Sequence, residues 1–487
     1  MLFVTQLEHR STARARTPSK GPVVAALAGV EAWERFSFYG MQAILVYYLY
    51  RELGMAETQA TALVGAYGAC LYLFAYVGGW FGDRVFGPER TLLTGCGLLV
   101  AGHLCLAFIP GYAGLAAGLL AIALGSGLLK TAAITLLGLA FPDRAGSRDA
   151  AFQIFYLGIN VGALFGPLLT GWLAQQYGFH VGFGAAAVLM VAGAVMYLAL
   201  RPKVLAVLGQ EAIGRPAQPI ASKRAASIVA AGTAFVALIL ALLATDVLQP
   251  DGLVMGLLAL TVLAAVGLFV QALTSPETTK EERSKVLSYI PLFICSTAYW
   301  GLFAQTAGVF AVYSDQRLDR TIGDFTIPAP WTQSLNPFYI LVFSLPIAFA
   351  MARFAPRRHV VMGGGLALAG AGMFLLLPFV GGGEASTPFL ALAGCVLCMS
   401  LGELFIGPVG MSSTGAHAPA AFRTRFAALY FLTMAIGTSL AGTASVLYDS
   451  TNPSSERAYL LVVGLVPVVI GLTVALRGAR VVARAEK

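Results

Sequence analysis

Five charged residues stand inside otherwise apolar stretches of the sequence, and these are Glu31, Glu34, Arg35, Lys130 and Glu403. Each charge at the centre of a membrane costs about 2.5–3.5 kcal/mol on insertion scales. Such residues persist where they pair with one another or line a water-filled path. A purely structural salt-bridge cluster is the alternative, and it is the weaker interpretation because buried ion pairs stabilise proteins less than apolar packing does.

The spacing of these charges predicts where they gather. Glu31, Glu34 and Arg35 are spaced i, i+3, i+4, so they project from one face of a helix. Lys130 lies in GSGLLKT, which superficially resembles a phosphate-binding loop, but Leu129 stands where that loop needs glycine. The sequence therefore argues against nucleotide binding and for a charged interior.

Polar neutral residues accompany the charges in both halves of the chain. Asn160 and Asn336 lie in apolar surroundings, and each could instead be a helix-packing hydrogen bond. Glu403 is flanked by Gly402 and Pro408, which loosen a helix and are typical of the central site of a transporter. Together these residues indicate one site lined by both halves.

The composition identifies the solvent in which such residues must be positioned. The chain has 487 residues, of which 58% are hydrophobic and 11% charged, with a mean hydropathy of +0.78. A soluble protein carries about 25% charged residues. The 55 glycines fit closely packed helices in lipid. The sequence therefore predicts an all-α membrane protein.

Apolar segments of about 20 residues predict fourteen transmembrane helices. They lie at about 22–50, 57–82, 91–110, 112–140, 150–174, 179–200, 225–246, 252–273, 286–313, 336–354, 359–380, 388–413, 424–447 and 458–478. With the N-terminus in the cytoplasm, 25 of the 31 Lys and Arg residues fall in cytoplasmic segments and four in outer loops. This asymmetry predicts that both termini are cytoplasmic.

Polar breaks divide the helices into six, two and six. The predicted divisions are a tail (1–21), an N-terminal bundle (22–200), a linker with two extra helices (201–285), a C-terminal bundle (286–480) and a second tail (481–487). The net charge of +8 comes mostly from predicted cytoplasmic loops, so it indicates orientation and contact with anionic lipid rather than nucleic acid.

Other classes of site have little support. Cys395 and Cys398 form a C-x-x-C pair without a second pair or a histidine cluster, so we expect small packing residues rather than a metal or redox site. The five histidines are scattered, and no nucleophile–base arrangement is visible, so we expect no enzyme, metal or cofactor. No secretory signal is visible at the basic N-terminus.

At these residues the chain resembles the proton-dependent oligopeptide transporter (POT, or PTR) family of the major facilitator superfamily, over roughly residues 22–480. The family motif E-x-x-E-R is matched by Glu31, Glu34 and Arg35. Further matches are F-Y-x-x-I-N-x-G (Phe155 to Gly162), G-x-x-x-D-R-x-x-G (Gly79 to Gly87), Q-S-x-N-P (Gln333 to Pro337), the fourth-helix Lys130, and Gly402-Glu403-Leu404.

The resemblance implies a fold, a function and residue roles. It implies two six-helix bundles with two extra helices between them, acting as a monomeric symporter in the bacterial inner membrane that imports di- and tripeptides with protons by alternating access. In the implied peptide site, Asn160, Asn336 and Glu403 bind the peptide amine, Lys130, Tyr39 and Tyr72 bind its carboxylate, and Tyr156 and Trp300 shape side-chain pockets. The residues implied in proton coupling are Glu31, Glu34, Arg35, Lys130 and Glu403. The implied cytoplasmic gate consists of Asp83, Arg84 and Arg90.

Four positions depart from the family pattern. Gln42 replaces an arginine that would share the peptide carboxylate, and Ala304 replaces a carboxylate linked to proton coupling. Gly407 and Tyr430 replace a serine and a tryptophan. The alternatives are therefore a family transporter for another small zwitterion or organic anion, or a sensor that binds peptide without net transport.

Overall fold

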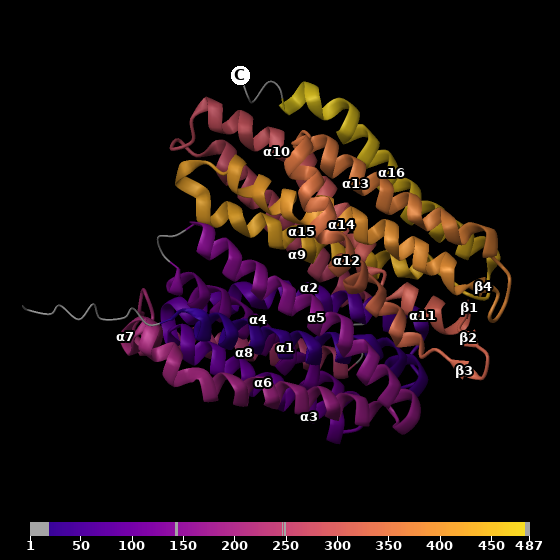
Figure 1. Cartoon of the computed structure of the whole chain (residues 1–487), viewed down its shortest axis with the longest axis horizontal. Helices are drawn as coiled ribbons and strands as arrows, with labels where there is room; N and C mark the ends of the chain where they lie inside the picture. Colours follow the sequence, from indigo (N-terminus) through magenta and orange to yellow (C-terminus); the bar gives the residue numbers. More distant parts are fainter. Residues whose placement is uncertain (1–18, 142–144, 246, 248–249, 483–487) are drawn as a thin grey trace, which may run out of the picture.

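The computed structural model describes residues 19–141, 145–245, 247 and 250–482. Within them the chain is almost entirely helical, with two six-helix bundles lying side by side (Figure 1). This arrangement is the major facilitator fold that the sequence predicts.

The N-terminal bundle consists of six long helices. They are α1 (Gly21–Tyr47), α2 (Glu57–Phe81), α3 (Pro88–Phe108), α4 (Gly111–Ala140), α5 (Ala145–Tyr177) and α6 (Phe179–Leu208). The last turns of α1 and α2 widen into π-helical segments at Tyr48–Glu52 and Gly82–Phe86. The predicted sixth helix ended at residue 200, but α6 continues through Pro202 and ends before Gly209, which has a φ of +80°.

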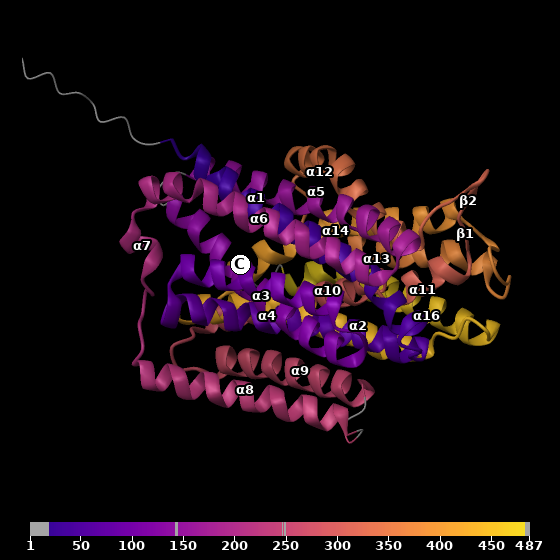
Figure 2. The same ribbon diagram turned by 90° about the horizontal axis from the view of Figure 1, so that it is seen from below.

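The linker contributes one short helix and two long ones. These are α7 (Gln210–Gly214), α8 (Ser222–Ala244) and α9 (Pro250–Thr274). Figure 2 shows α8 and α9 lying along one side of the molecule, with α9 next to the bundles and α8 outside it. Helix α9 packs on α2 and α15, so it contacts both bundles.

The C-terminal bundle contains the remaining helices and all the strands of the described chain. The helices are α10 (Lys280–Ala304), α11 (Val309–Gln316), α12 (Leu335–Phe354), α13 (Arg358–Gly372), α14 (Phe389–His417), α15 (Arg423–Ala444) and α16 (Pro453–Val482). Short 3-10 turns lie at Ala329–Ser334, Met373–Phe379, Ala420–Phe422 and Ser445–Leu447. Strand β1 (Leu318–Asp319) pairs in parallel with β4 (Thr387–Pro388), and β2 (Thr321–Ile322) pairs antiparallel with β3 (Phe325–Thr326).

One predicted transmembrane helix was wrong in one respect. The sequence predicted a continuous helix over 286–313, whereas the structure has a break at 305–308 between α10 and α11. The side chain of Gln305 fills this break, and its Oε1 accepts a hydrogen bond from the Tyr459 hydroxyl at 2.6 Å. Gly308 adopts a φ of −102° and a ψ of −107°, outside the helical region.

The number of spanning helices agrees with the prediction once α1 is included. Thirteen helices in the described part of the chain are long and apolar enough to cross a membrane. Helix α1 is the fourteenth, with 27 residues, but it carries Glu31, Glu34 and Arg35. Those three charges are the ones that the sequence singled out as functional.

Glycine allows the two bundles to approach closely. A Cβ atom on Gly65 of α2 would lie 2.8 Å from the Cα of Gly442 on α15, so no larger residue fits there without movement. This is the close helix contact that small residues permit in membranes.

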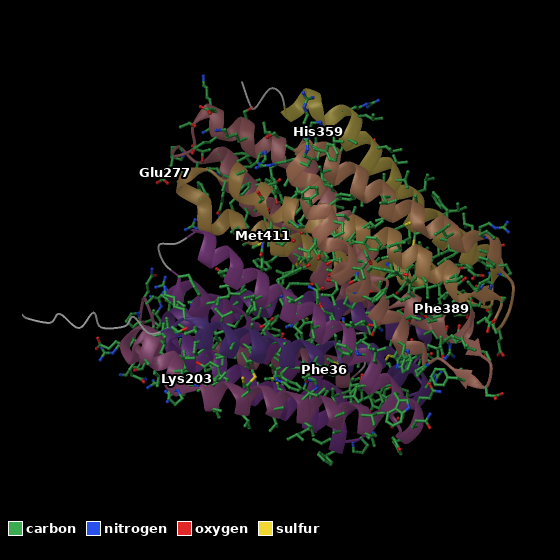
Figure 3. The ribbon with its side chains drawn as sticks, viewed as in Figure 1. Phe36, Lys203, Glu277, His359, Phe389 and Met411 are labelled. Carbon is green, nitrogen blue, oxygen red and sulfur yellow. The ribbon has the colours of Figure 1, made fainter. Side chains whose placement is uncertain are left out.

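The polar contacts between the bundles gather toward the end that carries the strands, called the strand end below. There Arg51 and Tyr50 bind Asp315, and the Trp331 indole N–H donates to the Leu168 carbonyl at 2.9 Å. The Ser334 hydroxyl donates to the Leu164 carbonyl at 2.7 Å. In Figure 3, Phe389 lies toward the strand end, while Lys203 and Glu277 lie at the opposite, linker end.

At the linker end the described residues form no side-chain hydrogen bond or ion pair between the two bundles. The linker instead pairs with the N-terminal bundle, because the N–H groups of Gln218 and Ile220 donate to the carbonyls of Asp83 and Arg84. Gly87 has a φ of +78°, and a Cβ on it would meet the Arg215 backbone at 2.8 Å. Among the described residues, the bundles are therefore joined by polar side-chain contacts at the strand end alone.

Candidate functional site

A buried ion cluster occupies the interior-facing side of α1. Arg35 forms a bidentate contact with Glu34, and its Nη2 lies 2.7 Å from Glu34 Oε1. The same Nη2 donates to the Ser126 hydroxyl of α4 at 2.9 Å, and that hydroxyl donates to Glu34 Oε1 at 2.8 Å. Three groups thus close one ring of charge-assisted hydrogen bonds.

Glu31 belongs to the same cluster but is held differently. Its Oε1 lies 3.4 Å from Arg35 Nε, and neither of its carboxylate oxygens has a hydrogen-bond partner among the described residues. Its side chain is fully buried. A buried carboxylate without hydrogen bonds is the member of the cluster that gains most from taking up a proton.

Lys130 lies one turn beyond Ser126 on α4 and is partly exposed. It makes no hydrogen bond or ion pair with any residue that the structure describes. The charges of Glu31, Glu34 and Arg35 still act on it, which places all four in one neighbourhood. Lys130 is therefore a cation whose donors are open to a ligand.

The C-terminal bundle supplies an acidic half-site. The Asn336 side-chain amide donates to Glu403 Oε2 at 2.9 Å and to the Ser400 hydroxyl at 3.0 Å. Asn336 is the second residue of α12, and Glu403 lies midway along α14 between Gly402 and Pro408. No cation described in the structure pairs with Glu403 within 4 Å. The predicted pair of Asn336 and Glu403 is thus brought together.

Aromatic residues of the N-terminal bundle share the interior with Glu403. The charge of Glu403 acts on the hydroxyls of Tyr39, Tyr72 and Tyr156. Tyr156 is about half exposed, at 48%. The interior is thus lined by hydroxyls from one bundle and a carboxylate from the other.

Asn160 and Trp300 make contacts within their own bundles. The Asn160 amide donates one N–H to the Tyr156 carbonyl of its own helix at 3.0 Å, which leaves its oxygen as an acceptor. Trp300 is buried, and its indole N–H has no hydrogen-bond partner among the described residues. It packs edge-on against Tyr299 and Phe303, as expected of a residue that shapes an apolar wall.

The predicted cytoplasmic gate residues lie at the linker end. Asp83 and Arg84 are in the π-helical segment after α2, and Arg90 is in the first turn of α3. Asp83 and Arg90 are exposed, and none of the three forms a described ion pair. The structure brings the Asp83 and Arg84 backbones to the linker and forms no polar side-chain contact from them to the C-terminal bundle.

The departures from the family pattern have specific places. Gln42 makes no hydrogen bond to any described residue, and Ala304 ends α10 directly before its break. The Tyr430 hydroxyl donates to the Gly407 carbonyl at 3.2 Å, so two departures contact each other. The backbone carbonyl of Gly407 thus provides the acceptor for the hydroxyl of Tyr430.

Sequence reasoning missed several polar residues. Ser126 binds the Glu34–Arg35 pair, and Ser400 binds Asn336. Their positions could have been read from the sequence, because Ser126 lies one helical turn before Lys130 and Ser400 one turn before Glu403. Further buried charges also escaped it, namely Glu89, which binds Arg201, and the pair Arg317–Glu456. Arg317 was expected in an outer loop, but it is only 3% exposed.

Comparison with known proteins identifies relatives over nearly the whole chain. A profile described as the POT family matches residues 89–459. The chain is 35% identical to the uncharacterized transporter YclF of Bacillus subtilis (strain 168), over 91% of this chain and 90% of that protein. It is 32% identical to a di-/tripeptide transporter of Lactococcus lactis subsp. cremoris, over 91% and 92% of the two chains.

Solved structures agree with the sequence comparison. A peptide transporter POT in complex with sulfate superposes with a TM-score of 0.88 at 35% identity, covering 95% of each chain. A POT family transporter in complex with 5-aminolevulinic acid superposes with a TM-score of 0.86 at 29% identity, covering 94% and 96%. From its profile, its relatives and its fold, this chain belongs to the POT family of multi-pass membrane transporters.

Proposed function

We propose that the protein is a proton-coupled symporter that imports di- and tripeptides by alternating access. The observation that carries the proposal is the placement of opposite charges on opposite bundles. Lys130 of the N-terminal bundle has no partner among the described residues, and Glu403 of the C-terminal bundle has only neutral ones. A peptide is a zwitterion whose carboxylate suits the first group and whose amine suits the second.

Closure of the interior around such a ligand needs the bundles to rock about the site. Polar contacts join them at the strand end and are missing from the linker end of the described chain. The positive-inside distribution assigns the linker end to the cytoplasm. We assign the linker end as the side on which the bundles separate, so the Asp315 contacts at the strand end must break for peptide to enter from outside.

Proton coupling is assigned to the α1 cluster. Protonation of Glu31 removes its attraction for Arg35 and leaves the bidentate Glu34–Arg35 pair in place. Because Lys130 feels the same carboxylates, the proton changes the electrostatic field at the proposed carboxylate site. Protonation and peptide binding are thus linked through shared charges.

The test is uptake of labelled dialanine into proteoliposomes of the purified protein. We expect accumulation above equilibrium with an inward proton gradient and only equilibration without one. Exchange across equal proton concentrations is measured beside it, and a cooperative thermal unfolding transition in detergent is the control for correct folding. Accumulation that ignores the gradient would contradict the symport mechanism, and absence of dialanine exchange would contradict the peptide substrate.

A second candidate is transport of another small zwitterion. Gln42 removes a cation from the carboxylate side, and one related structure holds 5-aminolevulinic acid, which carries an amine and a carboxylate. Competition of labelled dialanine uptake by 5-aminolevulinic acid and by single amino acids distinguishes the two. Stronger competition by a solute without a peptide bond favours the second candidate.

A further inference from the structure

A large apolar cavity lies away from the charged interior, between the extra helix α9 and the C-terminal bundle. Its volume is about 700 Å³. Its four walls are contributed by α9, α10, α15 and α16, with Phe269, Ile294, Leu440 and Val466 as one representative of each. The cavity therefore belongs to neither the proposed peptide site nor the strand-end contacts.

The chemistry of the walls excludes a polar occupant. Only Thr297 and Gln305 among the lining residues have polar side chains. The Thr297 hydroxyl donates to the Phe293 carbonyl at 2.9 Å, and Gln305 Oε1 accepts from Tyr459 at 2.6 Å. A bound water needs two to four polar partners, and the walls leave no such set free.

The surroundings identify the occupant. All four wall helices are membrane-spanning in length and composition. Val266, Ile294 and Val466 are 52%, 45% and 50% exposed, so the cavity opens sideways. At that depth the medium is lipid hydrocarbon, and an empty space of this size forfeits the dispersion contacts of its walls.

The α10 wall of the cavity is long enough to take a lipid chain across one leaflet. From Ile290 to Gln305 the α10 wall runs along the helix for about 22 Å at 1.5 Å per residue. One leaflet contributes about 15 Å of a typical hydrocarbon core. We propose that this cavity binds one acyl chain of a bilayer phospholipid, which fills the seam between α9 and the C-terminal bundle.

The position of the cavity gives the bound chain a structural effect. Helix α9 contacts α15 and α2, while its contact with α10 is slight in comparison. The cavity separates α9 from α10 and reaches Gln305, the first residue of the break. An acyl chain in this space makes the van der Waals contacts that no side chain makes there. It packs against α10 on the N-terminal side of the break.

The test uses the full-length protein in proteoliposomes containing a phosphatidylglycerol with a photoactivatable diazirine in its acyl chain. After illumination, labelled peptides are identified by mass spectrometry. We expect adducts concentrated on the cavity-facing residues of α9, α10, α15 and α16. Equal labelling of the outward faces of α8 and α12 would overturn the proposal, because it would show only the general lipid shell.

Two matched variants sharpen the test. Val466→Trp places an indole in the cavity, whereas Val469→Trp places one on the same helix outside it, at nearly the same exposure of 54%. Cavity labelling should fall at least about tenfold in the first variant, since occupied volume excludes the chain, and should persist in the second. Equal labelling of both variants would overturn the proposal.

A third variant guards against misfolding. Ala298→Phe fills the cavity from the α10 wall instead of α16, and a cooperative thermal unfolding transition in detergent reports whether each variant is folded. If a folded filling variant keeps its cavity adducts, the lipid does not occupy the cavity. If the illuminated wild type yields adducts on the outward faces of α8 and α12 but none on the cavity walls, lipid does not enter the cavity and the proposal fails.

Discussion

The two halves of the interior hold their charges in opposite ways. In the N-terminal bundle, Arg35 is bound to Glu34 and Ser126 and lies beside Glu31, so most of the charge is compensated inside the protein. In the C-terminal bundle, Glu403 has only neutral hydrogen-bond partners among the described residues, Asn336 and Tyr299. One region is a closed ion cluster with an open cation beside it, and the other is a single open anion.

The difference separates stability from function. A buried charge that already has a partner becomes costly when the partner is removed, by about 3–5 kcal/mol. A charge without a partner in the empty protein can be removed at little structural cost, and its loss should appear when ligand or proton binds. Lys130 is of the second kind, whereas Glu34 and Arg35 are of the first. Glu31, whose one described ion pair with Arg35 spans 3.4 Å, and Glu403, whose described partners are neutral, lie closer to the second kind.

The largest effect is expected at Lys130. Lys130→Ala should abolish gradient-driven uptake of dialanine, because a hydrogen bond to a charged group contributes about 1.5–3 kcal/mol, or about 10- to 150-fold in affinity. The melting temperature in detergent should change little, because Lys130 has no described partner that its removal would leave unpaired. Normal accumulation by the variant would remove Lys130 from the site.

The next comparison sets Glu31→Gln against Glu34→Gln. Both should lose gradient-driven accumulation, but only Glu34→Gln should also unfold at clearly lower temperature, because it breaks the bidentate partner of Arg35 and costs about 3–5 kcal/mol. Glu31→Gln should retain counterflow exchange, which needs no net proton movement.

Driven uptake, counterflow and melting temperature measured side by side over pH 5–8 separate these outcomes. Equal loss of stability in the two variants would show that Glu31 is as firmly paired as Glu34. Accumulation against the gradient by Glu31→Gln would move the proton pathway away from α1.

A smaller effect is expected at Glu403. Glu403→Gln should weaken competition by a dipeptide with a free amine about tenfold, which corresponds to about 1.4 kcal/mol, and should leave the N-acetylated dipeptide unchanged. The Asn336 amide keeps an oxygen acceptor in the variant, so folding should survive. An equal change for both peptides would place the amine elsewhere.

The smallest effects are expected at the two serines. Ser126→Ala removes hydrogen bonds to both members of a buried ion pair, whereas Ser400→Ala removes one hydrogen bond from a neutral amide and one to the Val396 carbonyl of its own helix. Stability should fall by about 1–3 kcal/mol for the first and by about 1 kcal/mol or less for the second. Melting temperatures of the two variants, measured together, show which loses more stability. A larger loss in Ser400→Ala than in Ser126→Ala would contradict the difference between the ion cluster of the N-terminal bundle and the single carboxylate of the C-terminal bundle.

Much of this protein follows from local features of the sequence. The apolar segments gave the helices within a few residues, since a span of hydrocarbon needs a fixed length of apolar chain. The i, i+3, i+4 spacing placed Glu31, Glu34 and Arg35 on one face of α1. The resemblance added Asn336 and Glu403 as members of one site, and the structure brings them within 2.9 Å.

Other features depended on contacts between distant segments. The break between α10 and α11 contains Gln305, which accepts a hydrogen bond from Tyr459, 154 residues away, and a continuous apolar run carries no sign of it. Arg317 looked like a loop residue, yet Glu456 and the Phe379 carbonyl bind it in the interior. Neither partner is recognisable without knowing which helices are neighbours.

The sequence by itself determined the class of protein, the number of spans and which residues carry charge into the membrane. Those properties follow from the composition and spacing of single segments, because lipid makes each helix satisfy its own backbone. Only the tertiary structure decided which carboxylate is bound and which is open, and which end of the bundles is joined. The physical reason is that hydrogen bonds and ion pairs act over a few ångströms, and helix packing alone sets those distances.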